Sequence, residues 1–181
     1  MFNYAFIVNS EGLTPEDYSW SYKNDAMQFE FFATSGMGMT KKYAKKLADK
    51  GFTDIDLCGD FDEKMAKEVA DATDGKIAVE YAKYFDEEME KLNLLNQLGE
   101  YGIIIKAPGL KEGSTKKEKI IGSEFNTTIV LIGSEKEAEA AAQSLVDEGI
   151  AFIELCSYFN ELRATAIINA IKGKVPVGYC G

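Results

Sequence analysis

The chain repeats one short segment 98 residues later, and this duplication constrains its fold more than any other feature. Asp54–Phe61 (DIDLCGDF) corresponds to Phe152–Phe159 (FIELCSYF). The same spacing joins identical residues on both sides of the segment: Ala44 and Ala142, Leu47 and Leu145, Gly51 and Gly149, Gly75 and Gly173, and Lys76 and Lys174. The sequence therefore predicts a small α/β unit that was duplicated and fused.

Apolar runs and helical patterns predict one order of elements in both halves. Continuous apolar runs at Tyr4–Val8 and Tyr101–Ile105 are typical of buried strands. Strands that alternate with helices indicate parallel pairing through right-handed crossovers. The predicted fold is α/β, with two tandem β-β-α-β-α-β units related by an approximate two-fold, each a mostly parallel sheet with flanking helices. The predicted boundaries are 1–82 for the first repeat, 83–98 for a linking helix and 99–181 for the second repeat.

Long irregular stretches are expected at residues 9–27 and 106–126. Loops of this length are often lids or binding loops. The first contains Trp20 and Tyr22, for which three interpretations stay open: a lid over a pocket, a contact for a partner, or an extended segment that covers the sheet. The second stretch has lysines in place of these aromatics, so the two repeats differ most here.

Composition restricts the classes of function. A net charge of −10 disfavours nucleic acid and anionic membrane surfaces as partners. No apolar run approaches the ~20 residues needed to cross a bilayer. Three cysteines without a Cys-x-x-Cys pair argue against a disulfide framework and structural zinc, and a reducing cytoplasm is the expected location. The chain has no histidine, so it cannot build Ser-His-Asp or Cys-His machinery alone.

Short motifs in both halves resemble a known family. The second half keeps Ile153–Cys156 (IELC) and Gly173–Gly178 (GKVPVG), and the first keeps Leu57–Gly59 (LCG). These motifs resemble a bacterial domain-of-unknown-function family of small α/β proteins, present here as a tandem duplication. The resemblance implies the fold and carries no activity. Asp60 and Ser157-Tyr158 replace glycines of the family pattern, which argues against close backbone approach of a ligand there, chiefly in the second repeat.

The candidate catalytic residues lie at the predicted carboxyl ends of matching strands, where open α/β sheets bind ligands. Cys58 and Cys156 could act as thiolate nucleophiles, or could be small buried apolar residues that end a strand. Asp56 and Asp60 offer carboxylates for acid–base or metal chemistry, but strand-end carboxylates are also common without such a role. No metal site is assigned.

Glycines near two strand ends are the candidate ligand-binding positions, together with Trp20 and Tyr22. Gly36 and Gly38 form a Gly-x-Gly turn between a strand and a helix, where backbone N–H groups can hold an anion. The turn lacks the third glycine of a dinucleotide fingerprint, so a tight turn with a helix cap is the competing interpretation. Gly59 follows Cys58 at the other strand end.

Two functions remain as hypotheses. The first is a non-catalytic module in the cytoplasm that binds a small molecule or a protein, or associates with itself. The second is a small enzyme that uses Cys58 or the Asp56 and Asp60 edge. No cofactor can be assigned from the sequence.

Overall fold

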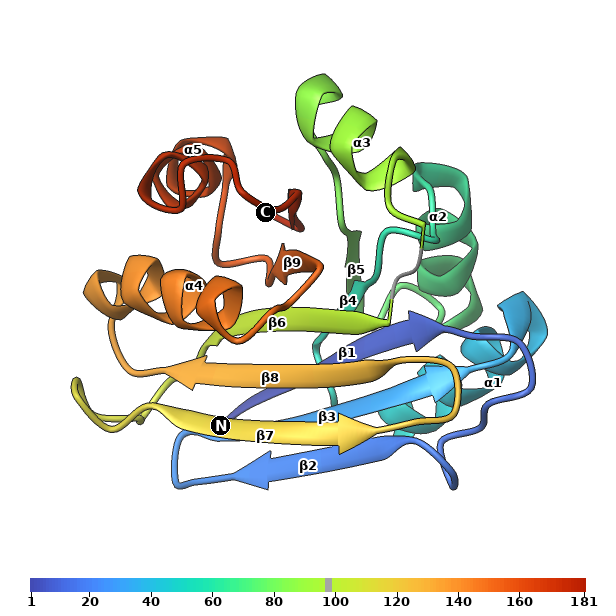
Figure 1. Ribbon diagram of the computed structural model, residues 1–181. Helices are drawn as coiled ribbons and strands as arrows, with labels where there is room; N and C mark the ends of the chain where they lie inside the picture. Colours follow the sequence, from blue (N-terminus) through green and yellow to red (C-terminus); the bar gives the residue numbers. More distant parts are fainter. Residues whose placement is uncertain (97–98) are drawn as a thin grey trace. The chain divides into compact units, whose positions relative to one another are not determined.

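The computed structural model describes residues 1–96 and 99–181 of the 181-residue chain. Residues 97 and 98, at the end of the expected linking segment, lie outside the described residues. The chain divides into two compact units, Met1–Ala82 and Lys83–Gly181 (Figure 1). Each unit is a five-stranded, mostly parallel sheet with helices, so the predicted α/β class and the two similar repeats are confirmed.

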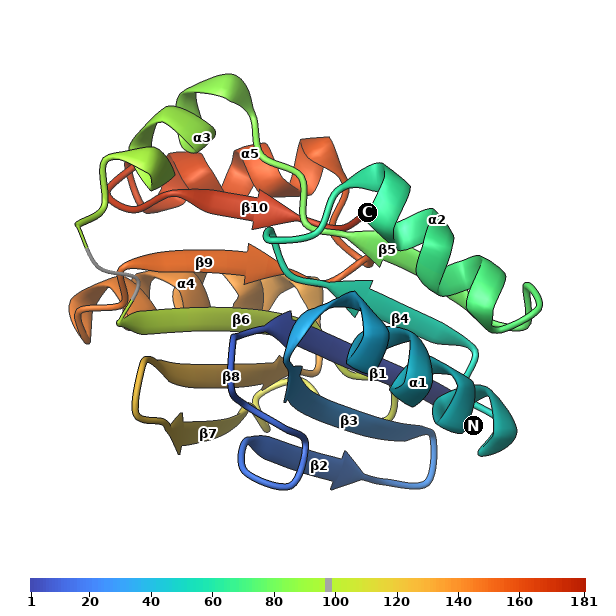
Figure 2. The ribbon, with the colours of Figure 1, turned by 90° about the vertical axis from the view of Figure 1, so that its right-hand side faces the viewer.

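The first unit has the sheet order β2-β3-β1-β4-β5. β1, β3, β4 and β5 run parallel, and β2 is an antiparallel edge strand beside β3. Figure 2 shows both helices of this unit on one face of its sheet. The elements are β1 Phe2–Asn9, β2 Ser19–Lys23, β3 Met27–Thr34, α1 Gly36–Asp49, β4 Asp54–Leu57, α2 Glu63–Ala72 and β5 Ala78–Tyr81.

The second unit repeats this arrangement with the order β10-β9-β6-β8-β7, in which β7 is the antiparallel edge strand beside β8. A helix precedes the sheet, within the range expected for a linking helix. The elements are α3 Asp86–Asn93, β6 Glu100–Lys106, β7 Lys116–Ile121, β8 Asn126–Ile132, the 3-10 turn η1 Glu135–Glu137, α4 Ala138–Asp147, β9 Phe152–Leu155, α5 Glu161–Ala170 and β10 Val177–Tyr179.

The predicted β-β-α-β-α-β order was wrong by one strand per unit. β2 and β7 lie inside the stretches 9–27 and 106–126 that were expected to be irregular. Both strands are short and largely polar, and they are held by a single neighbouring strand. Such a strand is held by backbone hydrogen bonds to its partner, and its exposed side chains lack the apolar pattern from which a strand is predicted.

Buried apolar side chains lie on both faces of each sheet, and the helices of the unit cover one of these faces. In the first unit Ile7, Ile55 and Leu57 face α1 and α2 and are fully buried, and the ring of Phe32 lies 5.6 Å from that of Tyr43 on α1. Side chains alternate between the faces of a strand. Tyr4 therefore points to the opposite face of the same sheet.

Candidate functional site

The candidate cysteines lie where the sequence predicts, directly after equivalent strands. Cys58 follows β4 and Cys156 follows β9, and both side chains are buried. The backbone N–H of Cys58 donates to Ile7 O at 3.0 Å, and that of Cys156 donates to Ile104 O at 3.1 Å. The Sγ of Cys58 accepts from the backbone N–H of Asn9 at 3.4 Å. Each cysteine thus ends a central strand as a buried side chain.

Burial should slow the reaction of these thiols with an external reagent. We expect Cys58, 7% exposed, and Cys156, 4% exposed, to be alkylated slowly in the native protein and rapidly once it is unfolded. Counting modified thiols by mass spectrometry in buffer and in denaturant checks this. Rapid and stoichiometric labelling of Cys58 in the native state would restore it as a nucleophile.

The candidate carboxylate Asp56 belongs to a buried pair that occurs in both repeats. Its Oδ2 accepts a hydrogen bond from the hydroxyl of Tyr4 at 2.6 Å. In the second repeat Glu154 takes the place of Asp56 and accepts from Tyr101 on β6. Glu154 Oε1 also accepts from the hydroxyl of Tyr84 at 2.7 Å. Both carboxyl groups are 1% exposed, so they act first as buried hydrogen-bond acceptors.

Asp60 and Asp56 do not have the same environment. Asp60 lies in the turn after Gly59 and is exposed, although the surrounding protein reduces its hydration and thereby raises its pKa. Asp56 is buried on the strand, with the tyrosine partner described above. Asp56 is thus buried and Asp60 is exposed, so the two carboxylates do not share one environment at this strand end.

The glycine turn at the start of α1 uses part of its polar surface within the protein. Gly36, whose φ is +77°, donates its N–H to Asn9 Oδ1 at 3.0 Å. The Ser35 hydroxyl accepts from Gly12 N at 3.0 Å. Gly38 has no atom near the position of an added Cβ. These contacts stabilise a tight turn, while the side chain of Ser35, the N-cap residue, makes no capping hydrogen bond to α1.

Trp20 and Tyr22 lie on β2, so they belong to an extended segment of the sheet. Their rings stack at 6.3 Å, and the Trp20 ring packs edge-on against Phe29 at 6.0 Å. Both side chains are partly exposed. The neighbouring Tyr18 is 1% exposed and belongs to the core.

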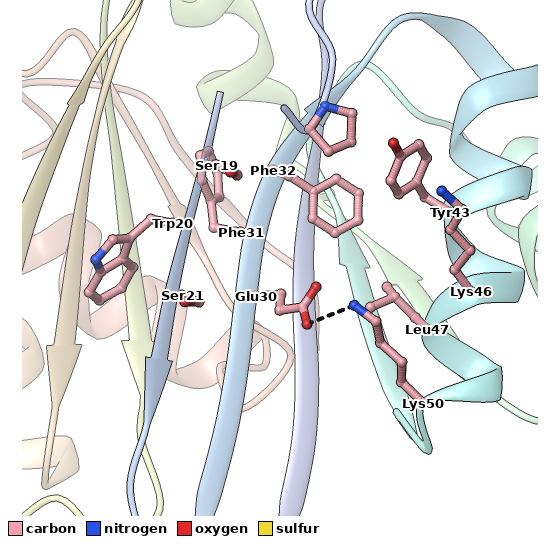
Figure 3. Close-up of a pocket in the computed structure, with 11 residues that line it drawn as sticks. Ser19, Trp20, Ser21, Glu30, Phe31, Phe32, Tyr43, Lys46, Leu47 and Lys50 are labelled. Atoms are coloured by element: carbon pink, nitrogen blue, oxygen red, sulfur yellow. Dashed lines mark hydrogen bonds and ion pairs between the residues drawn. The ribbon is translucent and has the colours of Figure 1, made fainter. Parts of the chain in front are cut away.

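A groove lies between α1 and the β2–β3 edge of the first unit, with a volume of about 690 Å³ (Figure 3). Lys46, in the last turn of α1, and Lys50, directly after this helix, enter the groove from one side. Ser19 and Ser21 on β2 lie opposite, and Figure 3 shows the Trp20 ring pointing away from the two lysines. The lining residues are Pro15, Ser19, Trp20, Ser21, Glu30, Phe31, Phe32, Tyr43, Lys46, Leu47 and Lys50.

Polar contacts hold the α1 side of this groove in place. The Tyr43 hydroxyl donates to Glu16 at 2.6 Å, and this hydrogen bond lowers the pKa of Glu16 and raises that of Tyr43. The Lys46 Nζ lies 4.1 Å from the centre of the Tyr43 ring. Lys50 pairs with Glu30 at 3.3 Å, and its side chain is 57% exposed. The groove therefore offers two exposed ammonium groups beside aromatic surface.

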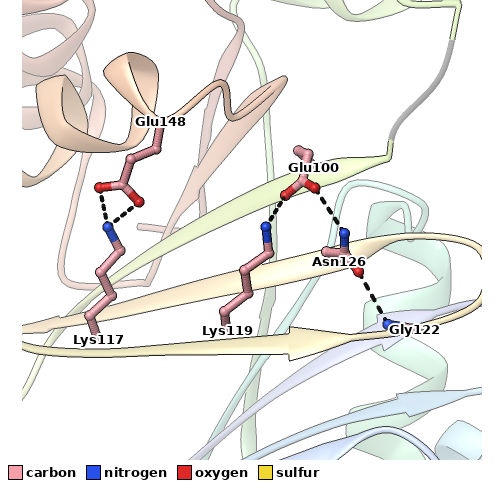
Figure 4. Close-up of polar contacts among 6 residues, drawn as sticks. All are labelled: Glu100, Lys117, Lys119, Gly122, Asn126 and Glu148. Carbon is pink, nitrogen blue, oxygen red and sulfur yellow. Dashed lines mark hydrogen bonds and ion pairs between the residues drawn. The ribbon is translucent and has the colours of Figure 1, made fainter.

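The second unit has a groove at the equivalent place, with a volume of about 410 Å³. At equivalent positions, the lysines of this unit lie on the strand side, whereas those of the first unit lie on the helix side. Lys117 and Lys119 occupy the strand positions of Ser19 and Ser21, and Ser144 and Glu148 occupy the helix positions of Lys46 and Lys50, each pair 98 residues apart. Lys117 on β7 forms an ion pair with Glu148 at the end of α4, so strand and helix are joined directly (Figure 4).

A second ion pair lies along the same strand. Lys119 Nζ is 3.0 Å from Glu100, which also accepts from Asn126 Nδ2 at 2.8 Å (Figure 4). The hydrogen bond from Asn126 and that from Lys119 lower the pKa of Glu100. The hydrogen bonds from Lys117 and Ser144 likewise lower the pKa of Glu148.

These pKa shifts predict a pH dependence. A lowered pKa means that Glu148 stabilises the fold fully above the usual glutamate range and loses this effect as the pH falls through the lowered pKa. We expect Lys117→Ala to reduce the free energy of unfolding by about 0.5 kcal/mol at neutral pH and by clearly less at about pH 3, where Glu148 begins to be protonated. Urea unfolding at both pH values measures this. Lys116→Ala is the control, and a pH-independent loss for Lys117→Ala would contradict the assignment.

The sequence hypotheses missed the tyrosine partners and the groove. Tyr4 and Tyr101 recur at a spacing of 97, and Asp56 and Glu154 recur at 98, so both pairs were visible as a repeated pattern. A signal for the groove is present in the sequence: Ser19 on the strand corresponds to Lys117 in the second repeat, and Lys50 at the helix end corresponds to Glu148.

Among residues 1–96 and 99–181, no group of three cysteine, aspartate or glutamate side chains is placed to hold a metal ion. In the same residues, no helix has the length and apolar character that a membrane span requires.

Comparison with protein families identifies both halves. The model of a family of unknown function, DUF6506, matches the chain twice, at residues 2–97 and 99–181. This chain belongs to the DUF6506 family. The two matches show the tandem duplication of the DUF6506 unit, while the bacterial origin suggested by the resemblance stays a prediction. A search of curated proteins found no match.

Proposed function

We propose that this protein is a non-catalytic binding module whose first unit takes a small organic anion in the groove between α1 and the β2–β3 edge. The observation that carries the proposal is that two exposed lysines, Lys46 and Lys50, line the groove of the first unit with one carboxylate, Glu30, whereas Lys117 of the second groove is paired with Glu148. The cytoplasmic location expected from the cysteine content is part of the same proposal.

The chemistry of the groove defines the ligand class. Lys46 and Lys50 provide two ammonium groups and Glu30, which pairs with Lys50, provides one carboxylate, so the lining keeps a net positive charge on a protein whose net charge is −10. The Ser19 and Ser21 hydroxyls can donate and accept hydrogen bonds opposite them. Phe32 and Tyr43 add aromatic surface. A carboxylate or phosphate attached to a flat apolar group fits this combination.

The second unit supports the assignment by contrast. There the strand lysine Lys117 is neutralised by Glu148, and Val130 and Ala141 stand where the first groove has Phe32 and Tyr43. Positive charge in the second groove is therefore satisfied within the protein. An enzyme that uses Cys58 or Asp56 has less support, because the thiol is buried and Asp56 already accepts from Tyr4.

The test uses phenyl phosphate as a probe, followed by amide chemical shifts. We expect saturable binding, and we expect the double variant Lys46→Ala, Lys50→Ala to weaken the affinity at least about tenfold, equivalent to about 1.4 kcal/mol. Raising the salt concentration should also weaken it, because exposed charges are screened.

The matched control is Lys41→Ala, Lys45→Ala, which removes the same charge from the same helix outside this groove. It should change the affinity less than about twofold, since the screening length is about 8–10 Å at physiological salt. If both double variants weaken binding equally, the effect comes from net charge alone, and the groove is not the binding site. Native mass spectrometry of protein from its own host would then look for a retained molecule.

A further inference from the structure

We infer that β2 is a self-association edge, at which a second copy of this chain adds its own β2 in antiparallel orientation. This inference goes beyond the proposed function, and Ser19, Trp20 and Ser21 belong both to this edge and to the groove. It starts from the position of β2 at the end of its sheet, where β3 is its one strand partner in the described part of the chain.

The hydrogen-bond phase of β2 determines which backbone groups point outward. Ala33 N donates to Tyr18 O at 2.9 Å, and Asn24 N donates to Met27 O at 2.9 Å. Backbone groups alternate along an antiparallel ladder, so Trp20 and Tyr22 also bond toward β3. Ser19, Ser21 and Lys23 therefore turn their N–H and C=O groups away from the sheet. All three residues are exposed.

The equivalent edge of the second unit is protected, and β2 is not. β7 carries Lys116, Lys117, Glu118 and Lys119 in succession. Lysines on an edge strand oppose the addition of another strand, because their charges cannot be brought together or buried. β2 has one charged residue, Lys23, among its five. The equivalent edge strand is therefore highly charged in the second repeat and nearly uncharged in the first.

The sequence of β2 is compatible with pairing to itself. With a two-fold axis at Ser21, each Ser19 lies opposite Lys23 of the other copy, and Ser21 lies opposite Ser21. The outward groups of these residues then exchange six backbone hydrogen bonds, two for each of the three facing pairs. Trp20 lies opposite Tyr22 of the other copy, which makes two cross-strand aromatic contacts. Like charges do not face each other in this register.

Sedimentation of the unliganded protein over a range of concentrations tests the inference. We expect a species of twice the 20.0 kDa chain mass. Ser21→Lys and Ser21→Pro should each weaken dimerisation about a hundredfold or more. Lysine adds a charge at the centre of the contact, and proline removes a backbone donor there. The N–H of Ser21 points outward, so proline removes no bond within the sheet. Circular dichroism checks that both variants are folded.

Ser114→Lys is the matched control, since it makes the same chemical change at an exposed loop position of the second unit. It should leave dimerisation unchanged. Trp20 is the single tryptophan, so its fluorescence should shift on dilution in the wild type and not in Ser21→Lys. A wild type that stays monomeric overturns the inference, as does a dimer that survives both Ser21 variants or is equally weakened by Ser114→Lys.

Discussion

Replacing Glu154 with alanine is expected to lower the free energy of unfolding by about 3 kcal/mol. Glu154 is 1% exposed and accepts hydrogen bonds from the hydroxyls of Tyr84 and Tyr101. Each lost hydrogen bond of a buried group costs on the order of 1–1.5 kcal/mol, and truncation leaves additional space in a packed interior. Denaturant unfolding of the purified variant measures the change.

Glu118→Ala is the control for this prediction. Glu118 is exposed on β7, so its truncation should change the stability by less than about 0.5 kcal/mol. Tyr84→Phe removes one of the two donors and should fall between them, at about 1 kcal/mol. If Glu154→Ala were as stable as Glu118→Ala, the buried acceptor would have no structural role.

Replacing Gly133 with alanine is expected to destabilise the protein by about 3 kcal/mol. Gly133 follows β8, and an added Cβ would lie 2.3 Å from Lys111 O and 2.7 Å from Leu110 O. Both obstacles are backbone atoms, so a change of side-chain rotamer cannot relieve the clash. The loop at 110–111 must move away from the strand end, which also strains the hydrogen bond from Gly133 N to Glu137 Oε2, now 3.0 Å.

Gly38→Ala is the matched substitution in the first unit. No atom lies within 4 Å of its added Cβ, and the residue is within α1. Alanine should therefore raise the stability by about 0.5–1 kcal/mol, because it reduces the conformational freedom of the unfolded chain. Thermal unfolding of both variants separates the two cases. Similar changes for Gly133→Ala and Gly38→Ala would exclude the close approach at Gly133.

Most of the fold follows from patterns that the chain carries twice. The run at Tyr4–Val8 predicts a buried strand because it is continuously apolar, and β1 covers it. The 98-residue spacing then transfers each element to the second unit. β2 and β7 could not be found this way, because their side chains are largely exposed and their hydrogen bonds come from β3 and β8.

The candidate site was less predictable than the fold. The sequence predicts that Cys58 and Asp56 lie near a strand end, but it does not show that Tyr4, 52 residues earlier, is within hydrogen-bond reach of Asp56. That contact depends on the diagonal register of β1 against β4. The divergent loops direct attention to the β2 region, but the proposed groove also needs Lys46 and Lys50, which lie at the end of α1, more than 20 residues away in sequence.

Gene fusion changes what a symmetric arrangement can encode. A homodimer of a single-unit protein must present the same cleft twice, since one sequence specifies both copies. With the copies joined in one polypeptide, Ser19 and Lys50 could persist in one half while Lys117 and Glu148 arose in the other. Each half can then change at these positions without the same change being imposed on the other half.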